Sequence, residues 1–300
     1  MIEVDPNDYH SKLTCNRENI FADDSWLSKS AISEFASGSP YVWRYHPRQY
    51  ESKAMAHGTL IDTLVTTPEL FKEMYVVTPY PLEREEKVKG EMVMKTISTA
   101  TNEAKDWAKK QTKTIITQDQ KDQAEQAAEM LLKKHTISAS IFANSKKQVI
   151  LKMTKEEWED AGQDWIEVNL KCLLDLVPDG DFLADLKTCH DLSLRGIERA
   201  IASFDYHAQA GMYLTLWNML NPDDQRNRFK FIFQSSKPPF EVAVVELSLM
   251  EINNGKAYIR KHLNELQRCA NLNRWPMIFG EKQIVVSRPT WAMMEDEENE

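Results

Sequence analysis

The hydrophobic residues of this chain follow two different spacings, one typical of strands and one typical of helices. Residues 167–177 are rich in β-favouring side chains, residues 178–181 (Pro-Asp-Gly-Asp) have the chemistry of a turn, and residues 182–187 form another apolar run. This order predicts a β-hairpin. Two more strands are predicted at 229–234 and 241–247, on either side of a Ser-Ser-Lys-Pro-Pro turn.

Helices are predicted before and after these strands. They cover 27–35, opened by Ser28 or Ser30; the apolar run 60–65, which follows Gly58 and ends before Pro68; 206–220, with Asp205 as its cap; and a long stretch from Ser248 toward Leu272. The charged segment 83–147 has apolar residues at helical spacing, which predicts a helical elaboration of two or more surface helices. We therefore expect an α/β (α+β) fold, with a central mixed β-sheet flanked by helices.

The composition limits the classes of protein that this chain can belong to. With 42% hydrophobic residues among 300, the chain can build the core of one large domain without disulfides or metals, and we expect a single domain over 1–290. Residues 291–300 form an acidic tail that we expect to be disordered. The formal net charge of −9 excludes a protein that coats nucleic acid by bulk charge, although a local basic groove stays compatible with it.

The sequence also bears on the compartment of the protein. No apolar stretch reaches the length of a membrane span, and the N-terminus lacks a basic region followed by an apolar one. The four cysteines are scattered without Cys-x-x-Cys spacing, which suits reduced thiols. We therefore expect a cytoplasmic protein without a membrane partner.

The predicted hairpin carries the candidate chemistry. Side chains alternate across a strand, so Asp185 and Lys187 project from the same face. A three-residue loop centred on Gly180 would place Asp175 directly opposite Asp185. A two-residue loop would place Asp175 opposite Ala184 instead, on the other face. The pattern leaves both registers open.

Two converging carboxylates favour a hard divalent cation such as Mg²⁺, with Mn²⁺ as a substitute. The carbonyl of Leu186 offers a further oxygen ligand, and Lys187 can activate a water for phosphodiester hydrolysis. An Asp-x-Lys pattern alone is more often a solvated hairpin, so the surrounding motifs decide between the two interpretations.

Those motifs resemble a known group of nucleases. Asp175, nine intervening residues and then 185–187 (Asp-Leu-Lys) resemble the signature of the PD-(D/E)XK nuclease superfamily. Downstream, Gln209 and Tyr213 match the Gln-x-x-x-Tyr motif of its RecB-type branch. Tyr206 stands at helical spacing from both, so the three residues share one helix face.

The N-terminal third of the chain resembles one branch of these nucleases in particular. Residues 27–35, Ser39-Pro40 and residues 58–68 are similar to the opening of the RecE-like exonucleases, the exodeoxyribonuclease VIII type found in phages and prophages. The similarity extends over roughly residues 25–250 in the same order. An ATP-driven helicase is not expected in this chain, because no phosphate-binding Gly-x-x-x-x-Gly-Lys-Ser/Thr loop occurs.

Two positions depart from the family pattern. The family helix reads Gly-x-x-x-His, whereas Asp62 occupies the histidine position here, and an aspartate can bind Mg²⁺ as naturally as an imidazole. His57 is the rival candidate, roughly 140° away around a helix that extends that far back. The second departure is Leu173, at a position where the family has arginine, which leaves Lys171 as the nearby basic residue.

The resemblance implies a metal-dependent DNA exonuclease that hydrolyses phosphodiester bonds from the ends of linear duplex DNA for single-strand annealing recombination. It implies a ring-shaped homo-oligomer of three or four subunits, an annealing protein as partner, and the bacterial host cytoplasm as location. The implied residues are Asp62, Asp175, Asp185 and Leu186 for the metal, with Lys187, Gln209 and Tyr213 completing the catalytic set. The alternative is a catalytically silent DNA- or protein-binding module that keeps the fold.

Three further groups are candidates for contact with DNA. They are the aromatic and basic cluster Tyr41, Trp43, Arg44 and Tyr45, the pair Lys146-Lys147, and the pair Arg195 and Arg199. The aromatic cluster could stack on bases, and the basic pairs could line a groove along the DNA backbone. Solubilising surface charge is the competing interpretation of the basic pairs.

Overall fold

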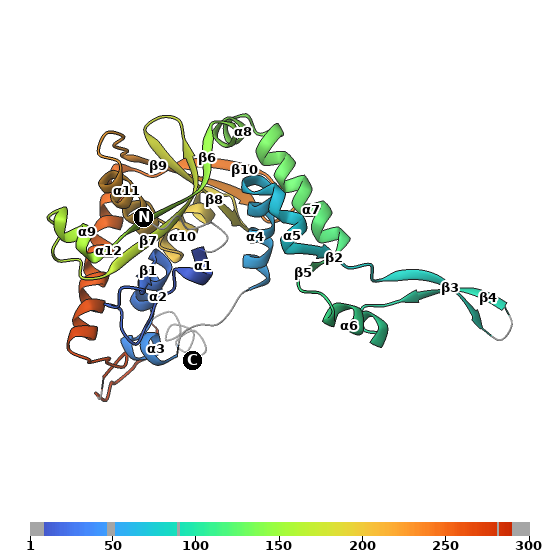
Figure 1. Ribbon diagram of the computed structural model, residues 1–300, viewed down its shortest axis with the longest axis horizontal. Helices are drawn as coiled ribbons and strands as arrows, with labels where there is room; N and C mark the ends of the chain where they lie inside the picture. Colours follow the sequence, from blue (N-terminus) through green and yellow to red (C-terminus); the bar gives the residue numbers. More distant parts are fainter. Residues whose placement is uncertain (1–8, 47–51, 89–90, 281, 290–300) are drawn as a thin grey trace, which may run out of the picture.

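The computed structural model describes residues 9–46, 52–88, 91–280 and 282–289. Its centre is a mixed six-stranded sheet in the order β1-β7-β8-β9-β10, with β6 paired to β7 as well (Figure 1). The strands are β1 (Trp26–Leu27), β6 (Ser145–Met153), β7 (Asn169–Pro178), β8 (Phe182–Cys189), β9 (Arg228–Ser235) and β10 (Val242–Glu246). Strand β8 runs antiparallel to β7 and parallel to β9, which makes the sheet mixed.

Helices cover both faces of this sheet. The main ones are α2 (Lys29–Ser37), α4 (Lys53–Thr66), α7 (Gln118–Glu129), α8 (Thr136–Ala143), α9 (Lys155–Asp160), α10 (Leu194–Ser203), α11 (Tyr206–Leu220) and α12 (Leu249–Asn271). Shorter helices are α1 (Tyr9–Lys12), α3 (Pro40–Tyr45), α5 (Phe71–Met74) and α6 (Asn102–Lys109). Every residue of β7 and β9 is buried or half-buried, as expected for strands covered on both sides.

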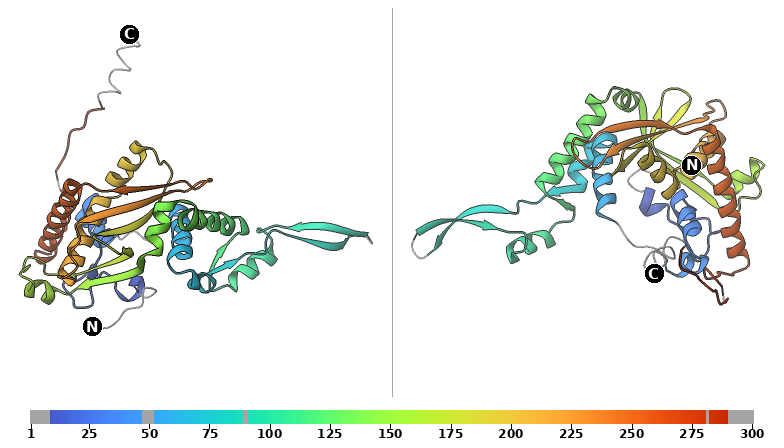
Figure 2. Two further views of the ribbon diagram at one scale, coloured as in Figure 1. Left: turned by 90° about the horizontal axis from the view of Figure 1, so that it is seen from above. Right: turned by 180° about the vertical axis from the view of Figure 1, so that it is seen from behind.

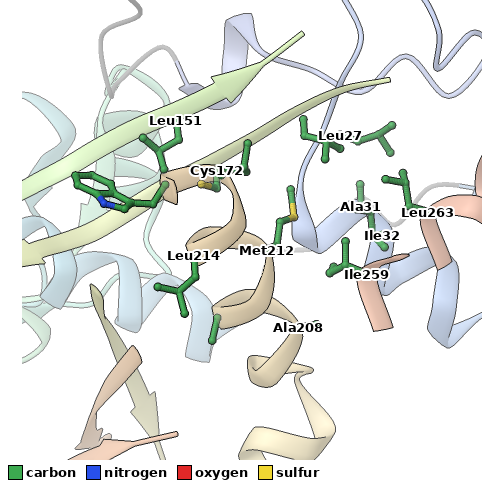
Figure 3. Close-up of a cluster of buried hydrophobic side chains, with 14 of the residues drawn as sticks. Leu27, Ala31, Ile32, Leu151, Cys172, Ala208, Met212, Leu214, Ile259 and Leu263 are labelled. Atoms are coloured by element: carbon green, nitrogen blue, oxygen red, sulfur yellow. The ribbon is translucent and has the colours of Figure 1, made fainter. Parts of the chain in front are cut away.

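Two hydrophobic clusters hold these layers together. One joins α2, α11 and α12 to one face of the sheet, and it includes Ile32, Cys172, Met212 and Leu263 (Figure 3). The other joins α4, α7 and α8 to the opposite face through residues such as Leu60, Ile61, Leu131, Leu186 and Ile232. Strand β8 therefore lies between two packed helical layers, and polar groups on it are buried unless they face an opening.

The predicted strands and helices of the core are confirmed, with the α/β class and the central mixed sheet. Helix α11 has the predicted bounds, and Ser28 and Ser248 cap α2 and α12 through their side chains. Two details are wrong. Helix α4 begins at Lys53 rather than after Gly58, because Ser52 caps it and the glycine lies inside the helix. Asp205 precedes α11 but does not cap it, since it has a left-handed backbone and its carboxylate accepts a hydrogen bond from Tyr258 Oη at 2.9 Å.

The segment 83–147 is helical only in part. Helices α6, α7 and α8 confirm the prediction for its later portion, but its beginning forms the strands β3 (Leu82–Val88) and β4 (Glu91–Ile97). These two strands pair antiparallel and project from the body of the molecule (Figure 1, Figure 2). Two further short strands, β2 (Tyr75–Val77) and β5 (Thr114–Ile116), pair where this segment joins the body. The acidic tail 291–300 lies outside the described residues.

No helix within the described ranges has the length and apolar character needed to cross a membrane. All four cysteines are free thiols, as the scattered spacing predicts, and Cys172 and Cys269 are buried.

Candidate active site

The register of the β7–β8 hairpin decides which side chains can meet. Leu176 pairs with Ala184, which corresponds to a three-residue loop and places residue 175 opposite residue 185. Gly180 in that loop has a φ of 112°, a conformation that favours glycine. The three-residue register is therefore confirmed, and the two-residue alternative is wrong.

Asp185 is the most closely held carboxylate of the site. It is 2% exposed, and Lys187 Nζ lies 2.5 Å from its Oδ2. From helix α11, Gln209 Nε2 donates a hydrogen bond to its Oδ1 at 2.5 Å. Gln209 is buried as well, so the contact joins strand β8 to helix α11 in the interior. The structure thus brings together three of the residues that the motifs pointed to.

Asp175 reaches across the hairpin rather than along its own strand. Its Oδ2 accepts a hydrogen bond from the backbone N–H of Leu186 at 3.0 Å. Burial and the nearby carboxylates of Asp185 and Asp62 raise the pKa of Asp175 well above its ordinary value. The three acids are therefore close enough to repel one another.

Asp62 completes this group from helix α4. Burial, followed by the charge of Asp185, raises the pKa of Asp62 to about 6. Gln148 Nε2 donates to its Oδ2 at 3.2 Å, whereas its Oδ1 is buried without a hydrogen-bond partner. An unsatisfied carboxylate oxygen in the interior is costly, and a cation is one group that can satisfy it.

His57 also lies on α4, because the helix extends back to Lys53. Its Nε2 is buried without a hydrogen-bond partner, and burial lowers its pKa. Burial is the only cause of that shift, whereas Asp62 feels both Asp185 and Lys187. The electrostatic coupling therefore favours Asp62 over His57 as the α4 member of the acidic group.

Lys187 is the positive charge of the group. Burial lowers its pKa, but the carboxylates of Asp185 and Asp175 outweigh burial and hold the pKa above its ordinary value. The Lys187 ammonium also lies 5.0 Å from the centre of the Tyr206 ring. One lysine thus faces three carboxyl groups.

The carboxylates are partly occupied by protein donors. Within the described ranges no three His, Cys, Asp or Glu side chains are gathered as a ready set of metal ligands. Lys187 and Gln209 hold Asp185, and the Leu186 amide holds Asp175. The oxygen donors and the unsatisfied Asp62 Oδ1 nevertheless fit a hard divalent cation, which would have to replace Lys187 at Asp185 Oδ2.

Tyr213 lies deeper than the other motif residues. Its ring packs against Phe229 with the centroids 6.3 Å apart, and burial raises its pKa well above the ordinary value. The charges of Asp185 and Asp175 contribute to that shift as well. Tyr213 is therefore near the acids but forms part of the packing beneath them.

Two polar residues near the acids escaped the sequence analysis. Gln148 falls between the pairs Lys147–Leu176 and Val149–Leu174, so it stands opposite Asp175, and its φ of 51° is unusual for a strand residue. Lys29, the first residue of α2, donates to the Phe204 carbonyl at 2.5 Å. Neither residue belongs to a periodic pattern, so no signal in a single sequence singles them out.

Lys29 stands close to the candidate catalytic lysine. Burial, followed by the charge of Lys187, lowers the pKa of Lys29 to about 8. Its ammonium lies 6.0 Å from the centre of the Tyr206 ring, which Lys187 also approaches. An anion between the two lysines would relieve their repulsion.

Two of the other residues that were candidates for DNA contact have structural roles instead. Trp43 is 1% exposed, and its indole N–H donates to the Ala31 carbonyl at 2.9 Å, so it belongs to the core. Lys147 donates to the Val65 carbonyl at 2.9 Å and thereby ties β6 to α4. Tyr45 stays at the surface and Arg44 is half-buried, with its guanidinium 5.4 Å from the Tyr45 ring centre.

Lys171, the basic residue left beside the Leu173 departure, is also structural. It is 6% exposed, and its ammonium donates to the carbonyls of Tyr9 and Leu13 while lying over the Tyr9 ring. It therefore fixes the N-terminal segment to β7 and is not available to a phosphate group.

A cavity of about 180 Å³ lies away from the acids, between α9, α11, α12 and β7. Its lining is mostly apolar and includes Trp158, Trp165, Met212 and Leu263, with Lys256 and Arg260 beside them. It contains no carboxylate, so the site chemistry described above does not extend into it.

The fold and this group of residues define a nuclease-like class of protein. Residues 31–287 match the family described as "PDDEXK-like domain of unknown function" (DUF3799), and the chain belongs to that family. It is also similar to a crystal structure titled "Putative exonuclease" from Eubacterium rectale, with a TM-score of 0.60 and 12% identity over 98% of each chain. At that identity the likeness shows the fold alone. No curated protein matches the chain.

Proposed function

We propose that this protein is a metal-dependent DNA exonuclease that hydrolyses phosphodiester bonds from the ends of linear duplex DNA. The observation that carries the proposal is the group formed by Asp185, Lys187 and Gln209 beside Asp175, in the family to which the chain belongs. Three buried acids with one lysine are unfavourable for a structural role, because uncompensated charges in the interior are destabilising. They suit a site that receives a cation and a phosphate.

The carboxylates of Asp62, Asp175 and Asp185, with the carbonyl of Leu186, would hold Mg²⁺, and Mn²⁺ would substitute. Bound there, the cation would act as a Lewis acid toward the scissile phosphate. After leaving Asp185, Lys187 would orient the attacking water, whose proton would pass to solvent. The positive charge of this lysine would also stabilise the negative charge that develops on the phosphate in the transition state.

Gln209 and Tyr213 would act on the geometry of the site. Gln209 donates to Asp185 Oδ1, so it fixes the plane of that carboxylate and acts as a positioning residue. Tyr213 also lies on α11, and its packing on Phe229 anchors this helix to strand β9. By keeping α11 aligned with β8, both residues would hold the scissile DNA strand in place.

The finer parts of the proposal rest on the sequence motifs. They are a RecE-like exonuclease role in single-strand annealing recombination, with an annealing protein as partner, a phage or prophage origin and a cytoplasmic location. The assembly would be a ring of three or four subunits that threads duplex DNA. An acidic protein has little bulk attraction for DNA, so topological retention would favour processive digestion.

Hydrolysis of end-labelled linear duplex tests the proposal. The purified protein is incubated with Mg²⁺, with Mn²⁺ or with a chelator, and the released nucleotides are measured beside a covalently closed circular duplex. We expect metal-dependent release from linear DNA and none from the circle. Equal cleavage of the circle would contradict the exonuclease proposal, and absence of cleavage with either metal would contradict a nuclease of any kind.

One observation favours a second candidate, a DNA-binding module without catalysis. The carboxylates are already engaged by Lys187, Gln209 and the Leu186 amide, an arrangement that a silent site would also keep. Such a module would bind duplex DNA in the same assay and leave it intact at every metal concentration.

A further inference from the structure

The β3–β4 hairpin extends from the body as an arm (Figure 1, Figure 2). Its base is anchored to the rest of the chain. There, Ile97 packs with Tyr80 and Ala104, and Arg84 forms an ion pair with Glu103 at 3.2 Å. Within the described residues the arm is a separate two-stranded sheet, and no third strand pairs with either edge.

Such an arm is not a stable unit by itself. A two-stranded ribbon is at best marginally stable in water without further strands or a covering helix. This arm also exposes three consecutive apolar residues of β4, Met92 (60%), Val93 (46%) and Met94 (57%). Because side chains alternate across a strand, these residues reach both faces of the ribbon. A strand added at the β4 edge would place cross-strand neighbours beside the exposed side chains on both faces at once.

The two edges of the arm differ in chemistry. In β3, the five consecutive residues 83–87 (Glu-Arg-Glu-Glu-Lys) are all charged, a composition that protects an edge strand from pairing. In β4, residues 91–95 (Glu-Met-Val-Met-Lys) have apolar residues at the centre. The β4 edge is therefore the one suited to pairing.

The order of residues in β4 is self-complementary. If a second β4 lies antiparallel with Val93 opposite Val93, each Met92 faces a Met94. The pairs at the centre are then all apolar with apolar, and such cross-strand pairs stabilise a sheet. A shift of one residue in one direction would instead place Met92 opposite Lys95 and Val93 opposite Met94, so the sequence favours the register centred on Val93.

We propose that the β4 edge of this arm pairs with the β4 edge of a second copy of the chain. The two arms would form a four-stranded antiparallel sheet around a two-fold axis at Val93. The contact is isologous, because the same surface serves both subunits. DNA is a poor alternative partner, since residues 82–97 contain four acidic and four basic residues and have no net charge.

The two-fold contact limits the assembly. It produces a dimer, or a tetramer made of two dimers, and it cannot by itself close a three-subunit ring. The inference concerns assembly only and does not depend on nuclease activity, so either proposal can fail without the other.

Mass measurements on a charged arm variant test the pairing. Met92→Lys/Met94→Lys places four ammonium groups at the centre of the contact in the assembled pair. Sedimentation equilibrium over a range of concentrations should give twice the chain mass or four times that mass for the wild type. For the variant, the dissociation constant of the arm contact should rise by at least about tenfold, since like charges replace the apolar pairs.

The matched control is Met250→Lys/Met277→Lys, which changes two methionines of similar exposure (67% and 57%) on the body. It should keep the wild-type mass. A wild type that is monomeric or trimeric, or an arm variant that associates as tightly as the wild type, would overturn the proposal.

Cross-linking tests the register independently. Val93→Cys places two thiols opposite each other at the two-fold axis, and mild oxidation should yield a disulfide-linked dimer. Glu85→Cys, on the charged β3 edge, should not cross-link beyond the wild-type background. Efficient cross-linking through residue 85 instead of residue 93 would contradict the β4 pairing.

Discussion

Asp185 receives donors from two different elements, the ammonium of Lys187 in β8 and the amide of Gln209 in α11. A hydrogen bond to a charged group contributes about 1.5–3 kcal/mol, so the Gln209 contact also fixes α11 against the sheet. Asp62 and Asp175 are less well compensated, and burial raises the pKa of both. Differences between single residues therefore assign separate roles to acids that look equivalent in the sequence.

Asp62 and His57 can be distinguished by substitution. Asp62→Asn should weaken the activation of hydrolysis by Mg²⁺ sharply, because it removes one carboxylate from the acidic group, whereas His57→Ala should change it little. In a chelator at pH 8, above the Asp62 pKa of about 6, Asp62→Asn should also melt at a higher temperature than the wild type. The reason is that the substitution removes a buried charge that repels Asp185. The reverse ranking in a metal titration of activity would assign the metal to His57.

Lys29 is expected to contact the DNA backbone. Lys29→Ala should weaken DNA binding measured in a chelator. It should also reduce the slope of log K against log salt concentration by about one, the change expected when one phosphate contact is lost. In steady-state kinetics it should raise KM more than it lowers kcat. Lys110→Ala, an exposed lysine at the end of α6, is the matched control. Unchanged binding and salt dependence in Lys29→Ala would refute this role.

The pH dependence of binding gives a second view of Lys29. Since its pKa is about 8, its charge is lost as the pH rises through that value, and wild-type affinity for DNA should fall between pH 7 and 9. Lys29→Arg keeps the charge over this range and should bind with little change. Other groups near Lys29 are Lys187, Asp205 and Asp185, so the same slope in wild type and Lys29→Arg would assign the titration to one of them.

At the scale of elements, helix α11 is held by its crossing with α12. Two glycines allow the close approach. A Cβ at Gly211 would lie 2.5 Å from the backbone nitrogen of Lys256, and a Cβ at Gly255 would overlap the carbonyl oxygen of His207. Because α11 carries Gln209, the crossing also sets the distance between Gln209 and Asp185.

Gly255→Ala should therefore destabilise the protein by about 1–3 kcal/mol, since the two helices must separate to admit the methyl group. Chemical denaturation measures the free energy of unfolding, and the hydrolysis rate should fall with it as α11 shifts. Gly38→Ala is the control, because its Cβ would meet its nearest neighbour, the Glu34 carbonyl oxygen, at an ordinary 3.6 Å. Equal stability of the two variants would show that the crossing tolerates the added methyl group.

Elements with a clear local pattern were predictable from the sequence. The alternation and turn residues of 167–187 predicted the hairpin, and the spacing of Gln209 and Tyr213 predicted one helix face. The β3–β4 arm was not predicted, because its charged residues suit a surface helix as well as a strand. Each strand pairs with the other, so neither one shows the pattern of a strand in the central sheet. The start of α4 was missed because Ser52 was not recognised as its cap.

At the scale of the whole molecule, the class and the central sheet followed from the order of strands and helices. The relation between distant segments did not. Lys29, Gln148 and Asp62 reach the acids of β7 and β8 from α2, β6 and α4, and their approach depends on how the helical layers pack on the sheet. Single-sequence periodicity has no information about such contacts, so only the motif residues of the site were predictable.

The central claim is that Asp185 and Lys187 form a catalytic site for phosphodiester hydrolysis. The measurement that tests it most directly is the Mg²⁺-dependent initial rate on end-labelled linear duplex, for the wild type, Asp185→Asn and Lys187→Ala. Asp181→Asn, in the exposed hairpin loop, is the matched control, and thermal melting confirms that each variant is folded. The account predicts a loss of about 10²–10⁴-fold in the first two variants and a wild-type rate in the control. Folded Asp185→Asn or Lys187→Ala protein that hydrolyses DNA at nearly the wild-type rate would contradict it.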